Sequence, residues 1–474
     1  MIRILSVASE CAPLVKTGGL ADVVGALPGA LRPLGCDMRV LLPGYRAVMG
    51  RIKKPQVVAE IPLFGGPARV LSVQAAGLDL LVLDAPHLFD RDGGPYIDAR
   101  GQDWPDNAMR FAALCMVAAQ IGAEGAGGWL PDVIHGHDWQ AGLVPEYLLG
   151  LGARMPFVFT IHNVAFHGNA PADTMAALLL DPERFTAENF EYWGQISALK
   201  AGLMGADRIT TVSQTYAQEL LTPEFGMGLD GVLRARAGDL VGIVNGIDTG
   251  VWDPATDAAI TPYKTPAGKH ANKKALRAEF DLPDTSGPLC ILVSRLTEQK
   301  GIDLMIAALP ALLERGGQLA LLGSGAPELE QALRDLAAKE PNVTVQIGYD
   351  EALSHRMMAG ADAILVPSRF EPCGLTQLYA LRYGTVPLVT LTGGLADTVI
   401  NASPAALARG VATGVQAFPI TAEALANALA HLCDLYAQPK VWATLQRNAM
   451  KQPVGWEVSA RAYAAIYSEM GARA

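Results

Sequence analysis

The sequence lacks an excess of positive charge, and it has no apolar run long enough to cross a bilayer. Its 474 residues include 37 Lys and Arg against 47 Asp and Glu, which gives a formal net charge of −10. This balance argues against nucleic acid or an anionic membrane as the main partner, so local cations must hold any phosphate-bearing ligand. The most apolar long stretch, residues 111–123, is shorter than the roughly 20 residues that a membrane-spanning helix needs.

Paired cysteines are also absent from the sequence. The six cysteines are scattered and none forms a CxxC pair, so neither a zinc site nor a disulfide framework is indicated. This usage fits a reducing compartment. The first residues, 1–10, have the pattern of a buried strand and not that of a signal peptide, and we therefore expect a cytoplasmic protein.

Two patterns resemble metal-binding motifs, but neither is well formed. The Asp-x-Asp pattern at residues 90–92 is followed by Gly-Gly-Pro, which is typical of a turn. His135, His137 and Asp138 are close neighbours in sequence, and adjacent residues rarely converge on one ion. We read these three as polar groups that line a ligand cleft. We therefore expect no metal and no other cofactor.

Length and composition indicate a globular protein with more than one domain. The chain is too long for one ordinary core, and half of its residues are hydrophobic while 18% are charged. Strand and helix patterns alternate along the chain, which predicts an α/β protein with two doubly wound domains and a ligand cleft between them. A polar, turn-rich segment at residues 242–257 marks the boundary. We predict domains at residues 1–245 and 246–455, and a C-terminal helix at 456–474 that crosses back to the first domain.

The most informative stretch is residues 363–399, which contains two strand–turn–helix units. The first strand pattern ends in a loop that holds Glu371, and a helical pattern restarts at Leu375. The second strand pattern ends at Gly393-Gly394, which open another helix. In open α/β sheets such loops bind ligands, and helix N-termini favour phosphate or sugar oxygens. Glu371 is therefore a candidate acceptor for hydrogen bonds from sugar hydroxyls.

The hexapeptide TGGLAD occurs twice, at residues 17–22 and 392–397. The repeat suggests two sheets that each offer a Gly-Gly turn to one ligand, although it is also simply favourable strand-to-helix turn chemistry. Lys16 precedes the first copy, so an ammonium group stands beside the turn at Gly18-Gly19. That arrangement suits a phosphate, but it lacks the spacing of a P-loop, and a loop lysine can also be merely solvated.

Polar side chains also follow the strand patterns in both predicted domains. In the first domain, Asp138 and the pair His162-Asn163 stand at two successive strand ends, which favours a ligand-binding role over a purely structural one. In the second domain, Arg295 and Lys300 place two cations at a strand-to-helix switch, which suits a pyrophosphate. Tyr349 stands at a further strand end, where it could stack on a base or cap the core.

These motifs together resemble the bacterial glycogen synthases, the relatives of plant starch synthases in glycosyltransferase family 5. The resemblance covers essentially the whole chain in order, and the lysine–TGGLAD and RFEPCGL motifs are together highly specific. The matching segments are residues 16–23, 137–139, 160–163, 294–301 and 367–375.

The resemblance implies a GT-B fold, with two Rossmann-like domains that face a deep interdomain cleft. It also implies a retaining glucosyltransferase that moves glucose from ADP-glucose to the non-reducing 4-hydroxyl of an α-1,4-glucan. No nucleic acid and no membrane are then expected as partners. Retention could arise by double displacement or by attack from the face that the leaving group occupies. We favour attack from that same face, with the leaving phosphate taking the proton of the acceptor.

The resemblance also assigns roles to individual residues. It implies that Lys16 binds the nucleotide sugar and that Arg295 and Lys300 hold its diphosphate. The residues implied to act in catalysis are Glu371, His162, Asp138 and Glu10. The remaining residues implied to bind substrate are Gly18, Gly19, Asn163, Tyr349, Cys373, Gly374, Leu375, Thr376, Gly393 and Gly394.

Three positions depart from the patterns of related enzymes. Many retaining GT-B enzymes have a second glutamate eight residues after the first, where this chain has Tyr379, as is usual for glycogen synthases. Gln140 stands where many relatives have histidine, and His167 stands where glutamine is commoner. The last two departures concern the acceptor side of the reaction.

Other functions are compatible with parts of this pattern. A glucan phosphorylase shares the architecture, but the chain has no C-terminal Gly-rich motif with a lysine for pyridoxal phosphate. A nucleotide-sugar epimerase of the same fold would need no glucan. A non-catalytic glucan-binding protein would have a degenerate site, whereas Lys16, His162, Arg295, Lys300 and Glu371 are all present.

Overall fold

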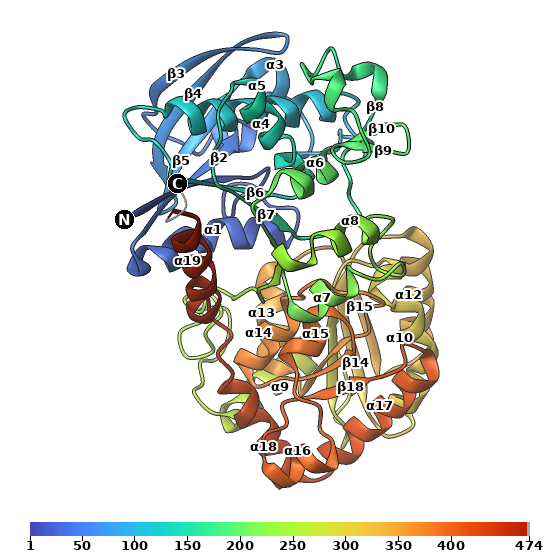
Figure 1. Cartoon of the computed structure of the whole chain (residues 1–474). Helices are drawn as coiled ribbons and strands as arrows, with labels where there is room; N and C mark the ends of the chain where they lie inside the picture. Colours follow the sequence, from blue (N-terminus) through green and yellow to red (C-terminus); the bar gives the residue numbers. More distant parts are fainter. Residues whose placement is uncertain (472–474) are drawn as a thin grey trace. The chain divides into compact units, whose positions relative to one another are not determined.

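The computed structural model describes residues 1–471 of the chain, which divide into two compact units (Figure 1). The first unit comprises Met1–Asn245 together with the chain from Trp456 onward, and the second comprises Gly246–Gly455. Each unit contains a central parallel sheet covered by helices, so the predicted α/β class is confirmed. None of the helices within residues 1–471 combines the length and apolarity that spanning a membrane requires.

The first unit is built on a nine-stranded sheet with the order β12-β11-β7-β6-β1-β2-β5-β4-β3. The strands are parallel from β12 to β5, whereas β4 and β3 continue the sheet in antiparallel pairing. Sequence order reverses between β1 and β6, so the loops after these strands flank the switch point where such sheets bind ligands. The strands are β1 (Ile2–Val7), β2 (Cys36–Pro43), β3 (Gln56–Leu63), β4 (Gly66–Ala75), β5 (Leu78–Asp84), β6 (Val133–His137), β7 (Phe157–Ile161), β11 (Arg208–Thr211) and β12 (Leu240–Gly242).

A second, small sheet in this unit was not predicted from the sequence. It has the order β8-β10-β9 and consists of β8 (Asn169–Pro171), β10 (Gln195–Ser197) and β9 (Glu191–Tyr192), paired antiparallel. The helix α6 (Ala198–Gly205) directly follows β10. Strands of two or three residues are too short to show an alternating pattern, which explains the omission.

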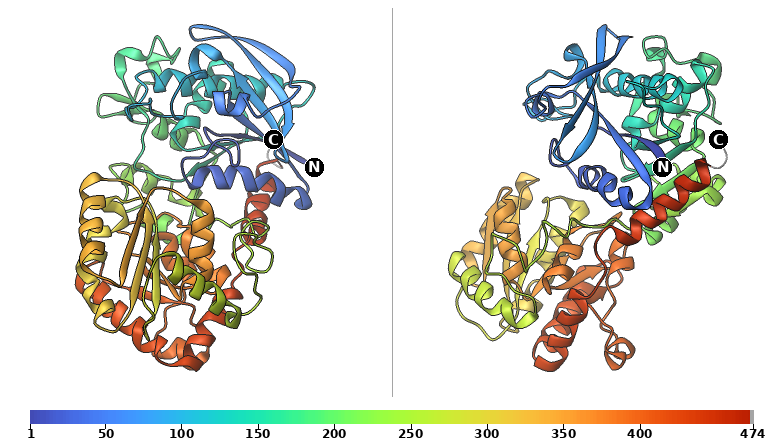
Figure 2. Two further views of the ribbon diagram at one scale, coloured as in Figure 1. Left: turned by 180° about the vertical axis from the view of Figure 1, so that it is seen from behind. Right: turned by 90° about the vertical axis from the view of Figure 1, so that its left-hand side faces the viewer.

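The C-terminal helix α19 (Glu457–Gly471) packs on the first unit, against α1 (Gly19–Leu31), β1 and β6 (Figure 2). Trp456, which directly precedes α19, lies with Tyr463 and Tyr467 of the helix in the same apolar cluster as Ile4 and side chains of α1. Burying such large rings stabilises the contact by several kcal/mol, at roughly 25 cal/mol per Å² of apolar surface. The last helix is therefore an integral part of the first unit.

The second unit contains a six-stranded, wholly parallel sheet with the order β15-β14-β13-β16-β17-β18. This is the Rossmann order, with its switch point between β13 and β16. The three-residue strand β18, which has no recognisable sequence pattern, completes the sheet at its edge. The strands are β13 (Leu289–Val293), β14 (Gln318–Gly323), β15 (Val343–Ile347), β16 (Ala363–Val366), β17 (Val386–Thr390) and β18 (Val415–Ala417).

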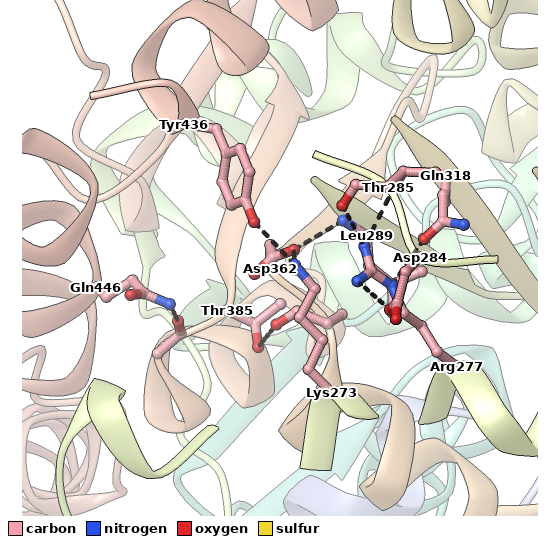
Figure 3. Close-up of polar contacts among 12 residues, drawn as sticks. Lys273, Arg277, Asp284, Thr285, Leu289, Gln318, Asp362, Thr385, Tyr436 and Gln446 are labelled. Atoms are coloured by element: carbon pink, nitrogen blue, oxygen red, sulfur yellow. Dashed lines mark hydrogen bonds and ion pairs between the residues drawn. The ribbon is translucent and has the colours of Figure 1, made fainter. Parts of the chain in front are cut away.

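A buried ion pair holds helix α9 (Lys269–Glu279) to this sheet (Figure 3). Lys273 Nζ lies 2.6 Å from Asp362 Oδ2 and donates a hydrogen bond to the Tyr436 hydroxyl. The same carboxylate oxygen accepts the N–H of Leu289 at the start of β13. Asp362 directly precedes β16, so the pair fastens the amino ends of the two strands that flank the switch point.

We expect Lys273→Ala to lower the free energy of unfolding by about 3–5 kcal/mol, because it leaves the Asp362 carboxylate buried and unpaired. Denaturant unfolding followed by circular dichroism measures this change. The matched control is Arg356→Ala, which breaks the solvent-exposed pair of Arg356 with Glu279 and should cost no more than about 1 kcal/mol. Equal losses in the two variants would contradict this account of Lys273.

Candidate functional site

The loop after β1 is organised by a buried carboxylate. Glu10 Oε1 accepts hydrogen bonds from the Thr17 and Tyr96 hydroxyls, both at 2.6 Å. Glu10 Oε2 accepts from the backbone N–H groups of Thr17 and Gly18. Both carboxylate oxygens are thus occupied by the chain itself, so in this structure Glu10 holds the TGGLAD turn. Tyr96 comes from the polar loop 89–107, and sequence reasoning had not singled it out.

Lys16 lies on the exposed side of this loop. Its ammonium is 2.7 Å from Asp22 Oδ1 in the first turn of α1, and its side chain is accessible to solvent. The N–H of Gly18 is taken by Glu10, so it is not free to bind a phosphate as the sequence had suggested. The ammonium of Lys16 is therefore the accessible positive group of this loop.

Asp138 follows β6 in a backbone conformation that non-glycine residues rarely adopt, with φ 55° and ψ −173°. Its Oδ1 accepts the backbone N–H of His162 at 2.7 Å and that of Asn163 at 3.4 Å. Such strain persists only where surrounding structure imposes it, and it concentrates at functional sites. Within residues 1–471 Asp138 Oδ2 has no hydrogen-bond partner, so this oxygen is available to a ligand.

Burial raises the pKa of Asp138 to about 7, and the negative charge of Glu10 adds to the effect. This coupling shows that Glu10 and Asp138 lie near one another, as expected for loops on the two sides of a switch point. A carboxyl group whose pKa is raised toward neutrality at such a place is a candidate functional group.

His162 is reached by a buried hydrogen-bond relay from β1. His137 Nε2 is 3.2 Å from the Ser6 hydroxyl, and His137 Nδ1 is 3.0 Å from His162 Nε2. Burial lowers the pKa of His162 to about 3 and that of His137 well below its usual value. Both rings are therefore neutral near pH 7, and each carries a single N–H proton.

The direction of this relay follows from hydrogen-bond satisfaction. Ser6 is fully buried, and among the described residues its hydroxyl has only His137 as partner. A buried O–H that does not donate is costly, so Ser6 donates to His137 Nε2. His137 then carries its proton on Nδ1 and donates to His162 Nε2. His162 in turn carries its proton on Nδ1, for which residues 1–471 provide no hydrogen-bond acceptor, so this N–H is a candidate donor to a ligand.

His135 belongs to a separate, structural network. Its Nδ1 is 2.7 Å from the Tyr467 hydroxyl of α19, and its Nε2 is 2.6 Å from the Thr160 hydroxyl. His135 and His137 are both fully buried, so the prediction that they line a ligand cleft is wrong. They share one face of β6, and α19 covers that face; only Asp138, at the strand end, is left partly accessible.

In the second unit, Lys300 and Glu371 meet at the switch point of the sheet. Lys300 Nζ lies 2.5 Å from Glu371 Oε2, and the Ser368 hydroxyl donates to the same oxygen at 2.9 Å. Lys300 follows β13 and Glu371 follows β16, so a contact between two distant loops joins the predicted diphosphate-binding lysine to the predicted glucose-binding glutamate. Ser368 is a further site residue that the sequence had not indicated.

Arg295 is an exposed guanidinium in the loop after β13. Within the described part of the chain it has no hydrogen-bond or ion-pair partner, in contrast to Arg369, which forms a bidentate pair with Asp303. Tyr349, after β15, is also exposed, so it does not cap the core. Arg295 and Tyr349 thus offer a cation and an aromatic ring after β13 and β15, the two strands that flank β14.

Gly393 and Gly394 serve close packing. A Cβ at Gly393 would lie 2.0 Å from the Glu371 carbonyl oxygen, and one at Gly394 would lie 2.1 Å from the Cys373 carbonyl oxygen. The N–H of Gly394 donates to the carbonyl groups of Glu371 and Pro372, so it is not free to hold a phosphate. The second Gly-Gly turn therefore fixes the Glu371 loop from behind.

The remaining predicted substrate-binding residues lie where that loop enters α14 (Thr376–Tyr383). Cys373 is buried, Gly374 has φ 72°, and Leu375 and Thr376 form the start of the helix. Within residues 1–471 no group of three or more His, Cys, Asp or Glu side chains is arranged to hold a metal ion.

Comparison with known proteins agrees with this geometry. Residues 3–235 match the family described as starch synthase catalytic domain, and residues 273–449 match glycosyl transferases group 1. A glycogen synthase of Jannaschia sp. (strain CCS1) is 70% identical over 98% of this chain and 99% of its own. A glycogen synthase of Paracoccus denitrificans (strain Pd 1222) is 62% identical over the full length of both chains.

Solved structures show the same architecture. The catalytic domain of starch synthase IV from Arabidopsis thaliana, bound to ADP and acarbose, superposes with a TM-score of 0.88 at 30% identity. The match covers 99% of each chain. Sucrose-phosphate synthase from Thermosynechococcus elongatus shares the fold with a TM-score of 0.61 at 21% identity, over the full length of both chains. The two Rossmann-like units are those of the GT-B glycosyltransferases.

Proposed function

Because the chain belongs to the glycogen synthase family of glucosyltransferases, we propose that it transfers glucose from ADP-glucose to the non-reducing 4-hydroxyl of an α-1,4-glucan. The observation that carries this proposal is the Lys300–Glu371 pair at the switch point of a Rossmann sheet, beside the unpaired Arg295. The ADP bound by the starch synthase relative supports adenine in the donor, and the free cysteines suit the cytoplasm as its setting.

The donor side of the reaction is assigned to the second unit. Cleavage of the anomeric C–O bond leaves negative charge on the diphosphate, and preorganised cations stabilise such charge most effectively. Arg295 and Lys300 supply two cations from one loop of this unit. These side chains provide the charge that a metal ion would otherwise supply, so the proposed reaction needs neither a metal nor another cofactor.

Glu371 is assigned to the transferred glucose. Its Oε2 is held by Lys300 and Ser368, which leaves Oε1 to accept a sugar hydroxyl. A carboxylate fixed by an ammonium ion and a hydroxyl is oriented for hydrogen bonding and is a weakened nucleophile. We therefore assign retention to attack from the leaving-group face, with a donor phosphate oxygen taking the acceptor proton. Mass-spectrometric detection of a glucosyl–Glu371 adduct would refute this assignment.

The acceptor side is assigned to the first unit. His162 presents an Nδ1–H donor and Asp138 presents a free carboxylate oxygen, and the two residues are joined through the His162 backbone N–H. One donor and one acceptor at the ends of the neighbouring strands β7 and β6 can orient neighbouring hydroxyls of a sugar. Asn163, whose side-chain Oδ1 accepts the N–H of Ala165, shapes the loop beside them.

The test is incorporation of labelled glucose into glycogen from ADP-glucose or UDP-glucose in the presence of EDTA. We expect strong incorporation from ADP-glucose, little from UDP-glucose, and no loss on chelation. Preference for UDP-glucose would overturn the donor, and a requirement for metal would overturn the role given to the cations. Absence of incorporation from either donor would favour an epimerase or a non-catalytic glucan-binding protein.

A further inference from the structure

A two-residue turn joins β9 to β10 in the small sheet of the first unit, and a tryptophan occupies it. Tyr192 pairs with Gln195 across the turn, and Trp193 and Gly194 between them have φ values of 50° and 76°. Positive φ at both central residues is the requirement of a type I′ hairpin turn, for which Asn-Gly is the favoured sequence. The ring of Trp193 is 86% exposed.

Folding does not explain a tryptophan at this position. A left-handed backbone is unfavourable for a bulky side chain, whereas Asn adopts it readily. Exposure removes the stabilisation that burying the ring would bring. Trp193 thus carries a strained backbone and a large exposed apolar ring at once, and such a combination is typical of a binding surface.

Two further exposed apolar side chains stand around this turn. Tyr192 donates a hydrogen bond to the carbonyl of Met227, and its ring lies edge-on to His167 at 5.1 Å. Met227 itself has φ 50° and is 38% exposed, and Phe166, next to His167, is 58% exposed. Trp193 follows Tyr192 in the chain, the Met227 carbonyl accepts the hydrogen bond of the Tyr192 hydroxyl, and Phe166 precedes His167, whose ring contacts Tyr192. We call Phe166, Trp193 and Met227 the hairpin surface.

The hairpin surface is continuous with the candidate acceptor loop. Phe166 is three residues beyond Asn163, to whose carbonyl its N–H donates, and the Asn163 side chain accepts the N–H of Ala165. The turn is itself fixed, because the Glu191 carboxylate accepts the N–H of Gly194 at 2.7 Å. A ligand that begins at His162 and Asp138 and extends along this loop reaches exposed aromatic rings on a rigid support.

We propose that the hairpin surface is a binding site for the chain of the glucan acceptor, away from the reacting end. The proposal rests on the proposed function. Pyranose rings have apolar faces of C–H groups that stack on aromatic rings, and an extended polymer of such rings fits separate, uncharged aromatic contacts better than a closed pocket does. The hairpin surface keeps the glucan bound near the candidate acceptor loop, so that glucose is added to neighbouring ends of the glucan before the glucan dissociates.

The test compares the wild-type chain with Trp193→Asn, which suits the turn backbone and removes the ring. Affinity for glycogen is measured without donor, by retardation in native gels that contain glycogen. We expect about tenfold weaker binding in the variant, the loss typical of an aromatic anchor, with a melting temperature equal to or above that of the wild type. Trp193→Phe should restore most of the affinity.

The control variant is Leu149→Ala, which removes an exposed apolar side chain on α5 (Val144–Gly150) and should leave glycogen retardation unchanged. Equal retardation of the wild type and Trp193→Asn would overturn the proposal. So would a wild-type dimer that Trp193→Asn converts to monomers with unchanged glycogen affinity, because the surface would then bind a second copy of the chain. Retardation that depends on Trp193 in a protein that incorporates no glucose would support this surface and refute the proposed function.

Discussion

Lys300→Ala is expected to lower kcat for glucose transfer by about 10²–10³-fold, the loss typical of removing one preorganised charge from an active site. The Lys300 ammonium lies in a half-buried position at the carboxyl edge of the second sheet, where the proposed reaction leaves negative charge on the diphosphate. Initial rates at saturating ADP-glucose and glycogen measure the change. Lys300→Arg keeps the positive charge and should recover a substantial part of the lost rate.

The ion pair with Glu371 offers a second explanation for such a loss, and a double-variant cycle separates the two. If Lys300 served only to neutralise the Glu371 carboxylate, then Glu371→Gln would make Lys300→Ala nearly harmless, and the double variant would resemble Glu371→Gln alone. If both side chains contact the donor, the double variant should be less active than either single variant. A decrease in kcat of less than about tenfold for Lys300→Ala would contradict the role assigned to this lysine, because losing a charge that stabilises the transition state costs more than that.

The architecture was predictable because strand and helix patterns were strong and long. The stretch 363–399 folds as two strand–turn–helix units, β16 with α14 and β17 with α15 (Gly393–Thr398). The sequence did not predict β18 or the small sheet β8-β10-β9, because these strands are too short to show an alternating pattern. They form by pairing with other segments of the chain, and local sequence does not indicate such pairing.

The candidate site shows the same limit at the level of single residues. Sequence motifs placed Lys300, Glu371 and Asp138 at strand ends, where the structure has them. The motifs could not show that Lys300 contacts Glu371, since the contact joins two loops 71 residues apart in the chain. Nor could they separate the fully buried His137 from the partly accessible Asp138 beside it. Whether a side chain of β6 is buried depends on which face of the strand α19 covers, and tertiary packing decides that.

Asp138 is the residue whose function should depend most on pH. Its pKa is raised to about 7, so the folded protein keeps a proton on this carboxyl between about pH 4 and pH 7, whereas the unfolded chain has lost it. Ionisation thus works against folding: the stability that Asp138 contributes is fully present below about pH 4 and is lost as the pH rises through 7. In Asp138→Asn this dependence of the unfolding free energy on pH should disappear.

Activity should change in the opposite direction with pH. The proposed role of Asp138 Oδ2 is to accept a hydrogen bond from the glucan, and only the ionised carboxylate leaves this oxygen free of a proton. We expect kcat/KM for the glucan to rise with pH through about 7 and then to level, and Asp138→Asn to lower it by about 10²-fold and remove that rise. His162 cannot cause the same rise, since its pKa lies near 3. A rise that persists in Asp138→Asn would therefore assign it to another group and refute the carboxylate's role in binding the acceptor.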